Sequence, residues 1–414
     1  MLHRHDGDLY FEQVSLAEIA DIYGTPTFVY SETAIREAYQ SFAGAFRGHP
    51  HRICYAVKAN SNLAVLQVLA ELGAGFDIVS GGELARVIRA GGDPGRVVFS
   101  GVGKQDWEIE AALDAGIACF NIESASELQR LADIANRRDQ QAPVSIRVNP
   151  DVDPGTHPYI ATGLRENKFG VAMDTALEMY LQAGDLPSLN VVGIDCHIGS
   201  QITELAPFLD ALDKVLVLLD QVETAGISIS HVDLGGGIGV RYRDEVPVDI
   251  DAFASAVTQV MGSRSQTLMF EPGRYIVANA GLLLGRVITL KSNEDRHFAV
   301  IDAAMNDLIR PALYQAWQDV VPVGPGEGKA LNWDIVGPVC ETGDFLARDR
   351  ELALREGDLL AILSSGAYGA VMSSNYNTRM RAAEVMVSGD QHHCIRRRES
   401  LDDLLALESL LSRD

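Results

Sequence analysis

A regular alternation of short apolar runs and amphipathic helical patterns, from Ser31 to Glu271, limits the possible folds more than any other feature of this chain. Eight runs rich in β-branched residues begin at Ile53, Phe76, Val97, Ala118, Val144, Val191, His231 and Thr267. Helical patterns include Asn62–Leu72, Gly82–Ala90, Ala125–Arg137 and Phe208–Thr224, and Glu32–Phe46 precedes the first run. Strands that alternate with helices over about 240 residues predict an α/β fold, a (β/α)8 TIM-like barrel. A doubly wound open sheet is the alternative, which the strand count and the segment length disfavour.

The pattern changes after Ala280. Strand-like runs begin at Arg286, Phe298, Trp333, Asp358 and Glu384, without regular helices between them. They predict a second, mainly β domain, to which the first thirty residues also belong. We therefore expect a barrel over residues 31–279 and a β domain over residues 1–30 and 280–414. A helix over Ser400–Leu411 is expected to close the chain.

Acidic residues outnumber basic ones. The chain has 57 Asp and Glu against 34 Lys and Arg in 414 residues, a formal net charge of −23. This balance argues against nucleic acid or an anionic membrane as a partner, because phosphate binding needs an excess of Lys and Arg. No apolar run is long enough to span a membrane, and the start MLHRHDGDLYFEQ lacks the apolar core of a signal peptide. We therefore expect a soluble, cytoplasmic protein.

The cysteines are odd in number and widely scattered, at Cys54, Cys119, Cys196, Cys340 and Cys394. No C-x-x-C pair occurs, so neither a disulfide framework nor a zinc site is expected, and we predict no metal. Taken alone, each cysteine is expected to be a small buried packing residue.

Polar residues gather where the predicted strands end, which is where barrels of this kind place their chemistry. Lys58 directly follows the first strand in YAVKAN, and a desolvated lysine has a lowered pKa and can form a Schiff base. A surface lysine at the strand exit is the alternative. The other strand ends carry Asp77, Ser80, Asn121, Glu123, Arg147, Asn149, His197, the Gly235–Gly237 loop and the Glu271–Arg274 turn.

The glycine loop does not match a dinucleotide fingerprint, because Val240 stands where that pattern needs glycine. A G-x-x-x-x-G-K-[ST] sequence is also missing. The loop can still bring bare N–H groups close to one phosphate, as barrel phosphate sites do after strands seven and eight. A simple glycine-rich turn is the alternative. Arg274 could instead hold a substrate carboxylate with its bidentate fork.

Together these groups suit pyridoxal 5'-phosphate. Lys58 would form the Schiff base, and His197 could stack on the ring, although alone it would be read as a core histidine. A carboxylate such as Glu271 beside the pyridine nitrogen would keep that nitrogen protonated, so that the ring accepts electrons.

Eight motifs then resemble one family. In order they are YAVKAN, FDIVSGGEL, HIGSQI, DLGGGIGV, EPGR, MNDLIRPALY, GPVCETGD and GAYG. They resemble, along nearly the whole chain, the diaminopimelate decarboxylases of the alanine-racemase-like, fold type III pyridoxal phosphate enzymes. The resemblance implies a barrel joined to a β domain and a homodimer with active sites shared across the interface.

The resemblance also implies residue roles toward the cofactor. Lys58 would be the Schiff-base lysine, His197 would pack on the ring, and Glu271 would bind the ring nitrogen. The phosphate would be held by Ser200, Gly235, Gly236, Gly237 and the turn Glu271, Pro272, Gly273 and Arg274. Tyr368 would touch both cofactor and substrate.

Substrate roles follow from the same resemblance. Arg274, Arg310 and Tyr314 would bind the substrate, largely through carboxylates, and Glu341 would meet its distal ammonium. Cys340, supplied by the partner subunit, would return the proton to the substrate carbon. The roles of Asp77, Glu123, Arg147, Asn149 and Lys168 stay open between supporting and structural.

The implied activity is that of a carboxy-lyase which converts meso-2,6-diaminopimelate into L-lysine and CO2, the last step of lysine biosynthesis. A decarboxylase for ornithine, arginine or a carboxylated polyamine is an alternative. The segments IRPALY and CETGD count against it, because those relatives typically lack the arginines that would bind a distal carboxylate. An amino acid racemase would usually carry an arginine, not Glu271, at the ring nitrogen. A non-catalytic homologue would often lack the residues at Cys340, Glu341 and Tyr368.

Overall fold

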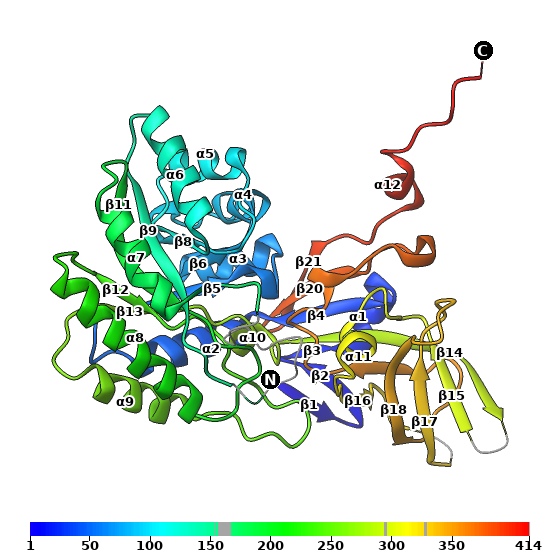
Figure 1. The fold of residues 1–414 in the computed structure, drawn as a ribbon. Helices are drawn as coiled ribbons and strands as arrows, with labels where there is room; N and C mark the ends of the chain where they lie inside the picture. The colour runs from blue at the N-terminus through cyan, green and yellow to red at the C-terminus, as the bar shows by residue number, and fades with distance from the viewer. Residues whose placement is uncertain (154, 156–166, 294–295, 327–328, 414) are drawn as a thin grey trace. The chain divides into compact units, whose positions relative to one another are not determined.

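The chain divides into two compact units. The computed structural model describes residues 1–153, 155, 167–293, 296–326 and 329–413 (Figure 1). One unit, the barrel unit, is Ile35–Ile276, and the other, the β unit, combines Met1–Ala34 with Val277–Asp414. These bounds differ by a few residues from the predicted boundaries of 31–279.

Eight parallel strands form a closed barrel. Their order is β9-β11-β12-β13-β5-β6-β7-β8, and β8 pairs again with β9. All eight strands lie at the predicted runs, and the closure excludes the open sheet. A two-residue strand that the sequence did not indicate, β10 (Val171–Ala172), extends from β9. The barrel strands are β5 (His51–Ala56), β6 (Gly75–Ile78), β7 (Val97–Phe99), β8 (Cys119–Ile122), β9 (Ala142–Asn149), β11 (Leu189–Cys196), β12 (His231–Asp233) and β13 (Thr267–Phe270).

Helices connect the barrel strands and pack around them (Figure 1). Several begin at side chains that accept a hydrogen bond from the first turn, such as Ser80, Ser124 and Asp249. The helices of this unit are α2 (Glu32–Ala45), α3 (Leu63–Glu71), α4 (Gly81–Arg89), α5 (Asp106–Ala115), α6 (Ala125–Arg137), α7 (Met173–Gly184), α8 (Ala206–Thr224), α9 (Ile250–Met261) and α10 (Arg274–Val277).

Buried side chains from four barrel strands pack together. Cys54, Val98, Cys119 and Met269 form one buried cluster. Burial raises the pKa of the Cys54, Cys119 and Cys196 thiols well above the ordinary value, so these cysteines are packing residues, as expected. The same expectation is wrong for Cys394, which is exposed because it lies on the outer strand of its sheet.

The second unit is mainly β and uses both chain ends. Strand β4 (Thr27–Ser31) pairs with β14 (Gly281–Asn293) on one side and with β20 (Ala383–Ser388) on the other. The predicted second domain, with its contribution from the N-terminus, is therefore confirmed. The remaining strands are β1 (Leu2–His5), β2 (Asp8–Phe11), β3 (Val14–Ser15), β15 (Arg296–Ile301), β16 (Val320–Pro322), β17 (Leu331–Val336), β18 (Phe345–Leu352), β19 (Leu359–Ile362) and β21 (Gln391–Arg396).

In the part of the second unit that the structure describes there are three α-helices, and one of them corrects a prediction. They are α1 (Leu16–Tyr23), α11 (Arg310–Tyr314) and α12 (Leu401–Leu405). The predicted helix Ser400–Leu411 is wrong in length, because α12 ends at Leu405. Leu407 and Leu410 beyond it are 98% and 97% exposed, so no burial supports a longer helix. In the described part of the chain, no helix is both long and apolar enough to cross a membrane.

Candidate active site

Lys58 lies just beyond the C-terminal end of β5. The chain leaves the strand through a short 3-10 turn, Val57–Ala59, in which Val57 and Ala59 are buried while Lys58 is partly exposed. The Lys58 ammonium donates to Asp77 Oδ2 at 2.6 Å. Asp77 is fully buried at the adjacent position of β6, paired in register with Ala56. The lysine is thus an amine held beside a buried carboxylate at the barrel end.

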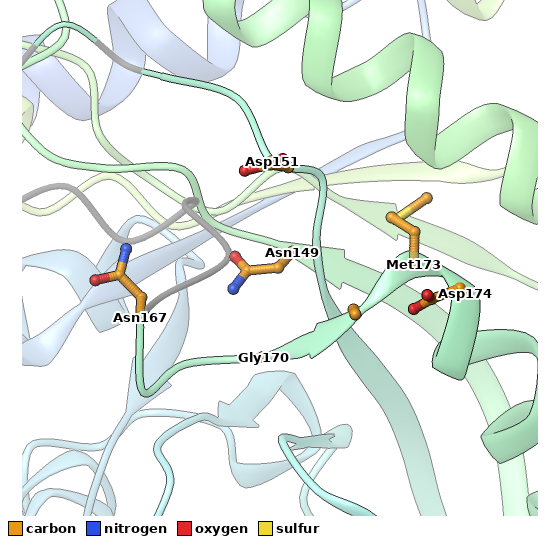
Figure 2. Close-up of a pocket in the computed structure, with 7 residues that line it drawn as sticks. Asn149, Asp151, Asn167, Gly170, Met173 and Asp174 are labelled. Atoms are coloured by element: carbon orange, nitrogen blue, oxygen red, sulfur yellow. The ribbon is translucent and has the colours of Figure 1, made fainter.

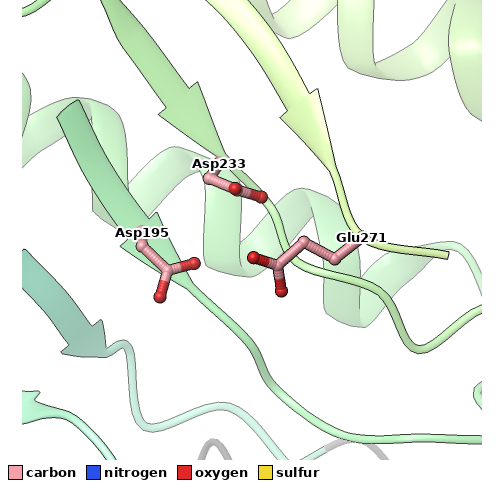
Figure 3. A group of neighbouring side chains, drawn as sticks. All are labelled: Asp195, Asp233 and Glu271. Atoms are coloured by element: carbon pink, nitrogen blue, oxygen red, sulfur yellow. The ribbon is translucent and has the colours of Figure 1, made fainter. Parts of the chain in front are cut away.

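Three further carboxylates converge next to this pair (Figure 3). Asp195 and Asp233 are register partners on β11 and β12, and Glu271 directly follows β13. Each offers an oxygen atom such that all three lie within 4.8 Å of one another. All three side chains are buried, and each has one oxygen without a hydrogen-bond partner among the described residues. The cluster concentrates negative charge where water is scarce.

Burial and mutual repulsion shift the acidity of this cluster. Burial, with added repulsion from Asp77 and Asp233, raises the pKa of Glu271 well above its usual range. Burial raises the pKa of Asp233 to about 7, although the N–H of Gly235 opposes the shift by donating to its Oδ1 at 2.8 Å. Burial and Asp233 likewise raise the pKa of Asp195, which Arg147 opposes. Burial and mutual repulsion thus raise the pKa of all three carboxyl groups.

Arg147 supplies positive charge to one side of the cluster. It lies on β9 in register with Asp195, and its guanidinium is 3.3 Å from Glu123 Oε1 and 3.9 Å from Asp195 Oδ2. Burial lowers the pKa of Arg147, but these two carboxylates outweigh burial and raise it above the ordinary value. Glu123 also accepts the N–H groups of Gly101 and Gly170, at 2.8 and 2.9 Å. Arg147 thus pairs with two carboxylates, and Glu123 links it to the backbone of Gly101 and Gly170.

These oxygens could also be considered as metal ligands. However, Arg147 lies beside Asp195 Oδ2, and the N–H of Gly235 already donates to Asp233 Oδ1. These two oxygens are therefore less available to bind a metal ion. The arrangement favours a carboxyl cluster that shares protons over one built around an ion.

His197 follows β11 and is held as a neutral ring. Its Nδ1 accepts the N–H of Gly236 at 3.2 Å, which places the ring proton on Nε2. Burial, together with the charges of Arg147 and Lys58, lowers the pKa of His197 well below the ordinary value. A neutral, fixed imidazole suits stacking on a flat ring better than it suits proton transfer.

The glycine loop after β12 needs its glycines because other backbone lies against it. A Cβ on Gly236 would overlap the carbonyl oxygen of Glu271, and one on Gly235 would lie 2.7 Å from His197 Nδ1. Gly235 and Gly237 also adopt φ of +65° and +106°. The N–H of Glu271 donates to the Gly235 carbonyl at 2.7 Å, which ties the loop to the next strand end.

Arg274 begins the short helix α10 and is buried. Its Nη2 donates to Ser200 Oγ at 3.0 Å, and its Nη1 donates to Tyr242 Oη at 2.6 Å. The Arg274 guanidinium is therefore oriented by two hydroxyl groups. Gly273, just before it, would place a Cβ 2.8 Å from that of Ala59, so the Pro272–Gly273 turn lies close to the Lys58 segment.

A polar pocket of about 300 Å³ lies at the end of β9 (Figure 2). Its lining comes from the strand end, from β10 and from the first turn of α7. Asn149, one of the residues whose role was left open, donates to the carbonyl of Phe169 at 2.8 Å and so helps to hold this wall. The lining residues are Asn149, Asp151, Asn167, Gly170, Ala172, Met173 and Asp174.

The other predicted site residues belong to the β unit. Arg310 is buried at the start of α11, and its Nη1 donates to the side-chain oxygen of Gln318 at 2.6 Å. That orientation of Gln318 is assigned from its hydrogen bonds, because its amide nitrogen then donates to the carbonyl of Leu363 at 2.6 Å. Tyr314, at the last position of α11, is half-buried.

Cys340 and Glu341 lie on a tight turn after β17, and both are exposed. The N–H of Cys340 donates to Asn377 Oδ1 at 2.8 Å, and buried Asp344 accepts the N–H groups of Val339 and Met305 at 2.9 and 2.6 Å. The turn is therefore well anchored while the side chains of Cys340 and Glu341 stay accessible. Tyr368 adopts φ of +55°, a strained backbone for a tyrosine of the kind that gathers at functional sites.

The structure thus brings Lys58, His197, Glu271 and the glycine loop together at one end of the barrel, and Ser200, hydrogen-bonded to Arg274, follows the Gly199 carbonyl that lies against Gly237. It places the remaining predicted residues, Arg310, Tyr314, Cys340, Glu341 and Tyr368, in the β unit. Sequence reasoning missed Asp195, Asp233 and Tyr242. The signal for the two aspartates was present, because each is a charged residue inside an otherwise apolar strand, VVGIDC and HVDL.

The barrel residues fit the cofactor that the sequence predicts. The glycine loop lies too close to Glu271, His197 and Gly199 for any Cβ, so only bare backbone borders the site there, and the N–H groups of Gly235 and Gly236 donate to Asp233 and His197. Glu271 carries a buried oxygen without a partner among the described residues, which a cationic ring nitrogen would satisfy. Lys58 is the primary amine beside them.

Gly236→Ala should destabilise the barrel unit by about 1–3 kcal/mol, because its Cβ must displace the backbone carbonyl of Glu271. Urea unfolding followed by circular dichroism measures the change. Gly103→Ala is the matched control, since a Cβ there meets nothing within 4 Å and should change stability by less than about 0.5 kcal/mol. Equal midpoints for the two variants would contradict the close approach at Gly236.

Comparison with known proteins identifies relatives along almost the whole chain. The family described as "Pyridoxal-dependent decarboxylase, pyridoxal binding domain" matches residues 32–278. The chain is 60% identical over 406 residues to the diaminopimelate decarboxylase of Pseudomonas aeruginosa, covering 98% of both chains. It is 58% identical over 410 residues to that of Vibrio cholerae, covering 99% of this chain and 98% of the relative.

Solved structures agree with the sequence relatives. The diaminopimelate decarboxylase of Helicobacter pylori, solved in complex with L-lysine, superposes with a TM-score of 0.92 at 42% identity, covering 94% of this chain and 98% of that one. The family match and the near-complete sequence similarity establish that this chain belongs to the diaminopimelate decarboxylases, which are pyridoxal-dependent carboxy-lyases.

Proposed function

We propose that this protein removes one carboxylate from meso-2,6-diaminopimelate and releases L-lysine and CO2, the last step of lysine biosynthesis, with pyridoxal phosphate as its cofactor. The observation that carries the proposal is the gathering of Lys58, Glu271, His197 and a glycine loop at one barrel end. The similarity to diaminopimelate decarboxylases over 98% of the chain supports the choice of substrate.

Five groups of the barrel unit would hold the cofactor. Lys58 would bind it covalently through Nζ, and neutral His197 would pack on its ring. Ser200, the Gly235–Gly237 loop and the Glu271–Arg274 turn would surround its phosphate, while Glu271 would hold its ring nitrogen. Once bound, pyridoxal phosphate withdraws the electron pair that a departing carboxylate leaves behind.

The substrate has two amino acid ends, so the site must recognise one while the other reacts. Arg274 and Arg310 would bind carboxylates, and both guanidiniums are buried and oriented by neutral hydrogen-bond partners. Glu341 would meet the distal ammonium, and Tyr314 and Tyr368 would complete the substrate contacts. A buried arginine left without its carboxylate is costly, which favours a diamino diacid over a diamino monoacid.

Cys340 would return a proton to the substrate carbon that has lost its carboxylate. We propose that it does so in the active site of a partner subunit, within a homodimer. Its exposure on an anchored turn supports this role, because the thiol is accessible and its backbone is fixed.

The cytoplasmic location is also part of the proposal, and the five free cysteines support it, since thiols persist in a reducing compartment.

The reaction is tested by supplying the purified protein, loaded with pyridoxal phosphate, with meso-diaminopimelate and measuring CO2 and lysine. Ornithine and lysine at the same concentration should react with a kcat/KM lower by about a thousandfold or more, because they lack the distal carboxylate. Preference for ornithine, or no release from meso-diaminopimelate, would contradict the proposed substrate.

Lys58→Ala should abolish covalent cofactor attachment. The visible absorbance of the lysine-bound cofactor should disappear, and borohydride should no longer fix the cofactor to the chain. Lys291→Ala, at an exposed position on β14, is the control and should keep both signals. Absorbance that survives in the Lys58 variant would show that another amine holds the cofactor.

Cys340→Ala should keep the cofactor absorbance but slow product formation strongly. Mixing this variant with Lys58→Ala chains tests the shared site. Each mixed dimer then has one intact site, so reassociation at equal amounts should restore about a quarter of the wild-type activity. No restored activity, although exchange of subunits is demonstrated, would mean that Cys340 serves its own chain.

A further inference from the structure

Two carboxyl groups at the barrel end remain without a cation after the charges are paired. Lys58 lies 2.6 Å from Asp77, and Arg147 is shared between Glu123 and Asp195. Asp233 and Glu271 have no ion-pair partner among the residues that the structure describes. Two adjacent buried carboxylates cannot both stay ionised at low cost, so this pair holds a proton.

The two oxygens of Asp233 have different hydrogen-bond surroundings. Oδ1 accepts the N–H of Gly235 at 2.8 Å, which fixes the side chain to the glycine loop. Oδ2 is buried without a hydrogen-bond partner among the described residues, as is Oε1 of Glu271, and the two carboxyl groups point toward each other (Figure 3). Ligand atoms of the pair lie within 4.8 Å. One proton between them would bridge these two oxygens and leave other lone pairs of the Glu271 carboxylate to meet a ring nitrogen.

We propose that Asp233 is a positioning residue that shares one proton with Glu271, carries that proton when the cofactor is bound, and so keeps Glu271 oriented and anionic. The inference rests on the proposed function, because it assigns Glu271 to the ring nitrogen. It deepens that function by making one side chain, Asp233, join the phosphate loop to the residue that meets the ring.

The surroundings of the pair are consistent with this role. Burial raises the pKa of both groups, that of Asp233 to about 7, so a proton is available to the pair near neutral pH. Nearby thiols are neutral because burial raises their pKa, and burial keeps His197 neutral as well. The charged or titratable groups that act on the pair are Asp77, Lys58, Asp195, Arg147, Cys54, Cys119, Cys196 and His197.

Asparagine imitates the protonated form, whereas leucine removes the hydrogen bonds at similar size. In Asp233→Asn, the amide oxygen can accept from Gly235 and the amide nitrogen can donate to Glu271. Cofactor affinity, measured by equilibrium dialysis without substrate, should stay within about threefold in Asp233→Asn and fall at least about tenfold in Asp233→Leu. A loss in Asp233→Asn as large as that in Asp233→Leu would overturn the proposal, because it would mean that the anion is required.

Infrared difference spectroscopy of the holoenzyme locates the proton directly, and it decides the matter even if the leucine variant does not fold. The wild-type spectrum minus that of Asp233→Asn should contain the C=O stretch of a protonated, buried carboxyl group. A difference that contains only carboxylate bands would overturn the proposal. So would a divalent metal ion that co-purifies with the wild type and is lost from Asp233→Asn, since the cluster would then be a metal site.

Cofactor affinity and the infrared band are measured without diaminopimelate. Failure of the substrate assignment would leave both results unchanged, whereas failure of the shared proton would leave the decarboxylation assay unchanged. The two proposals are therefore tested separately.

Discussion

The convergence of buried carboxyl groups at the C-terminal end of the barrel is the constraint on which the site depends. Parallel pairing places Arg147, Asp195 and Asp233 at one level of three neighbouring strands, and Glu271 follows on the next. Charges in this environment are stable only when they are paired with cations or neutralised by protons. The barrel end therefore favours positively charged groups, such as the Lys58 amine that pairs with Asp77.

Backbone proximity is the second constraint. The Gly235–Gly237 loop lies so close to the Glu271 turn and to His197 that side chains cannot be accommodated there. The same closeness lets one loop hold two side chains, since the N–H of Gly236 donates to the imidazole of His197 and the N–H of Gly235 donates to Asp233. The glycine loop, His197 and Asp233 are thus mechanically linked within the barrel unit.

Most of the fold could be predicted from the sequence, because strand and helix periods are local. The eight barrel strands lie at the predicted runs, as do α2, α3, α4, α6 and α8, and the strand ends Lys58, His197 and Glu271 followed from them. Prediction failed where burial decided the outcome. The C-terminal helix is short since its leucines find no partner, and Cys394 is exposed because its strand lies at a sheet edge. Asp195 and Asp233 were passed over because they lie inside apolar runs.

The sequence by itself determined the alternation of strands and helices, the absence of a dinucleotide or P-loop fingerprint, and the motifs that identify the family. Only the tertiary structure decided which residues meet. Strand register and closure of the barrel bring Asp77, Asp195, Asp233 and Glu271, distant in sequence, into one buried cluster. Their shared proton and raised pKa values arise from burial and mutual distance, physical quantities that no local pattern of residues encodes.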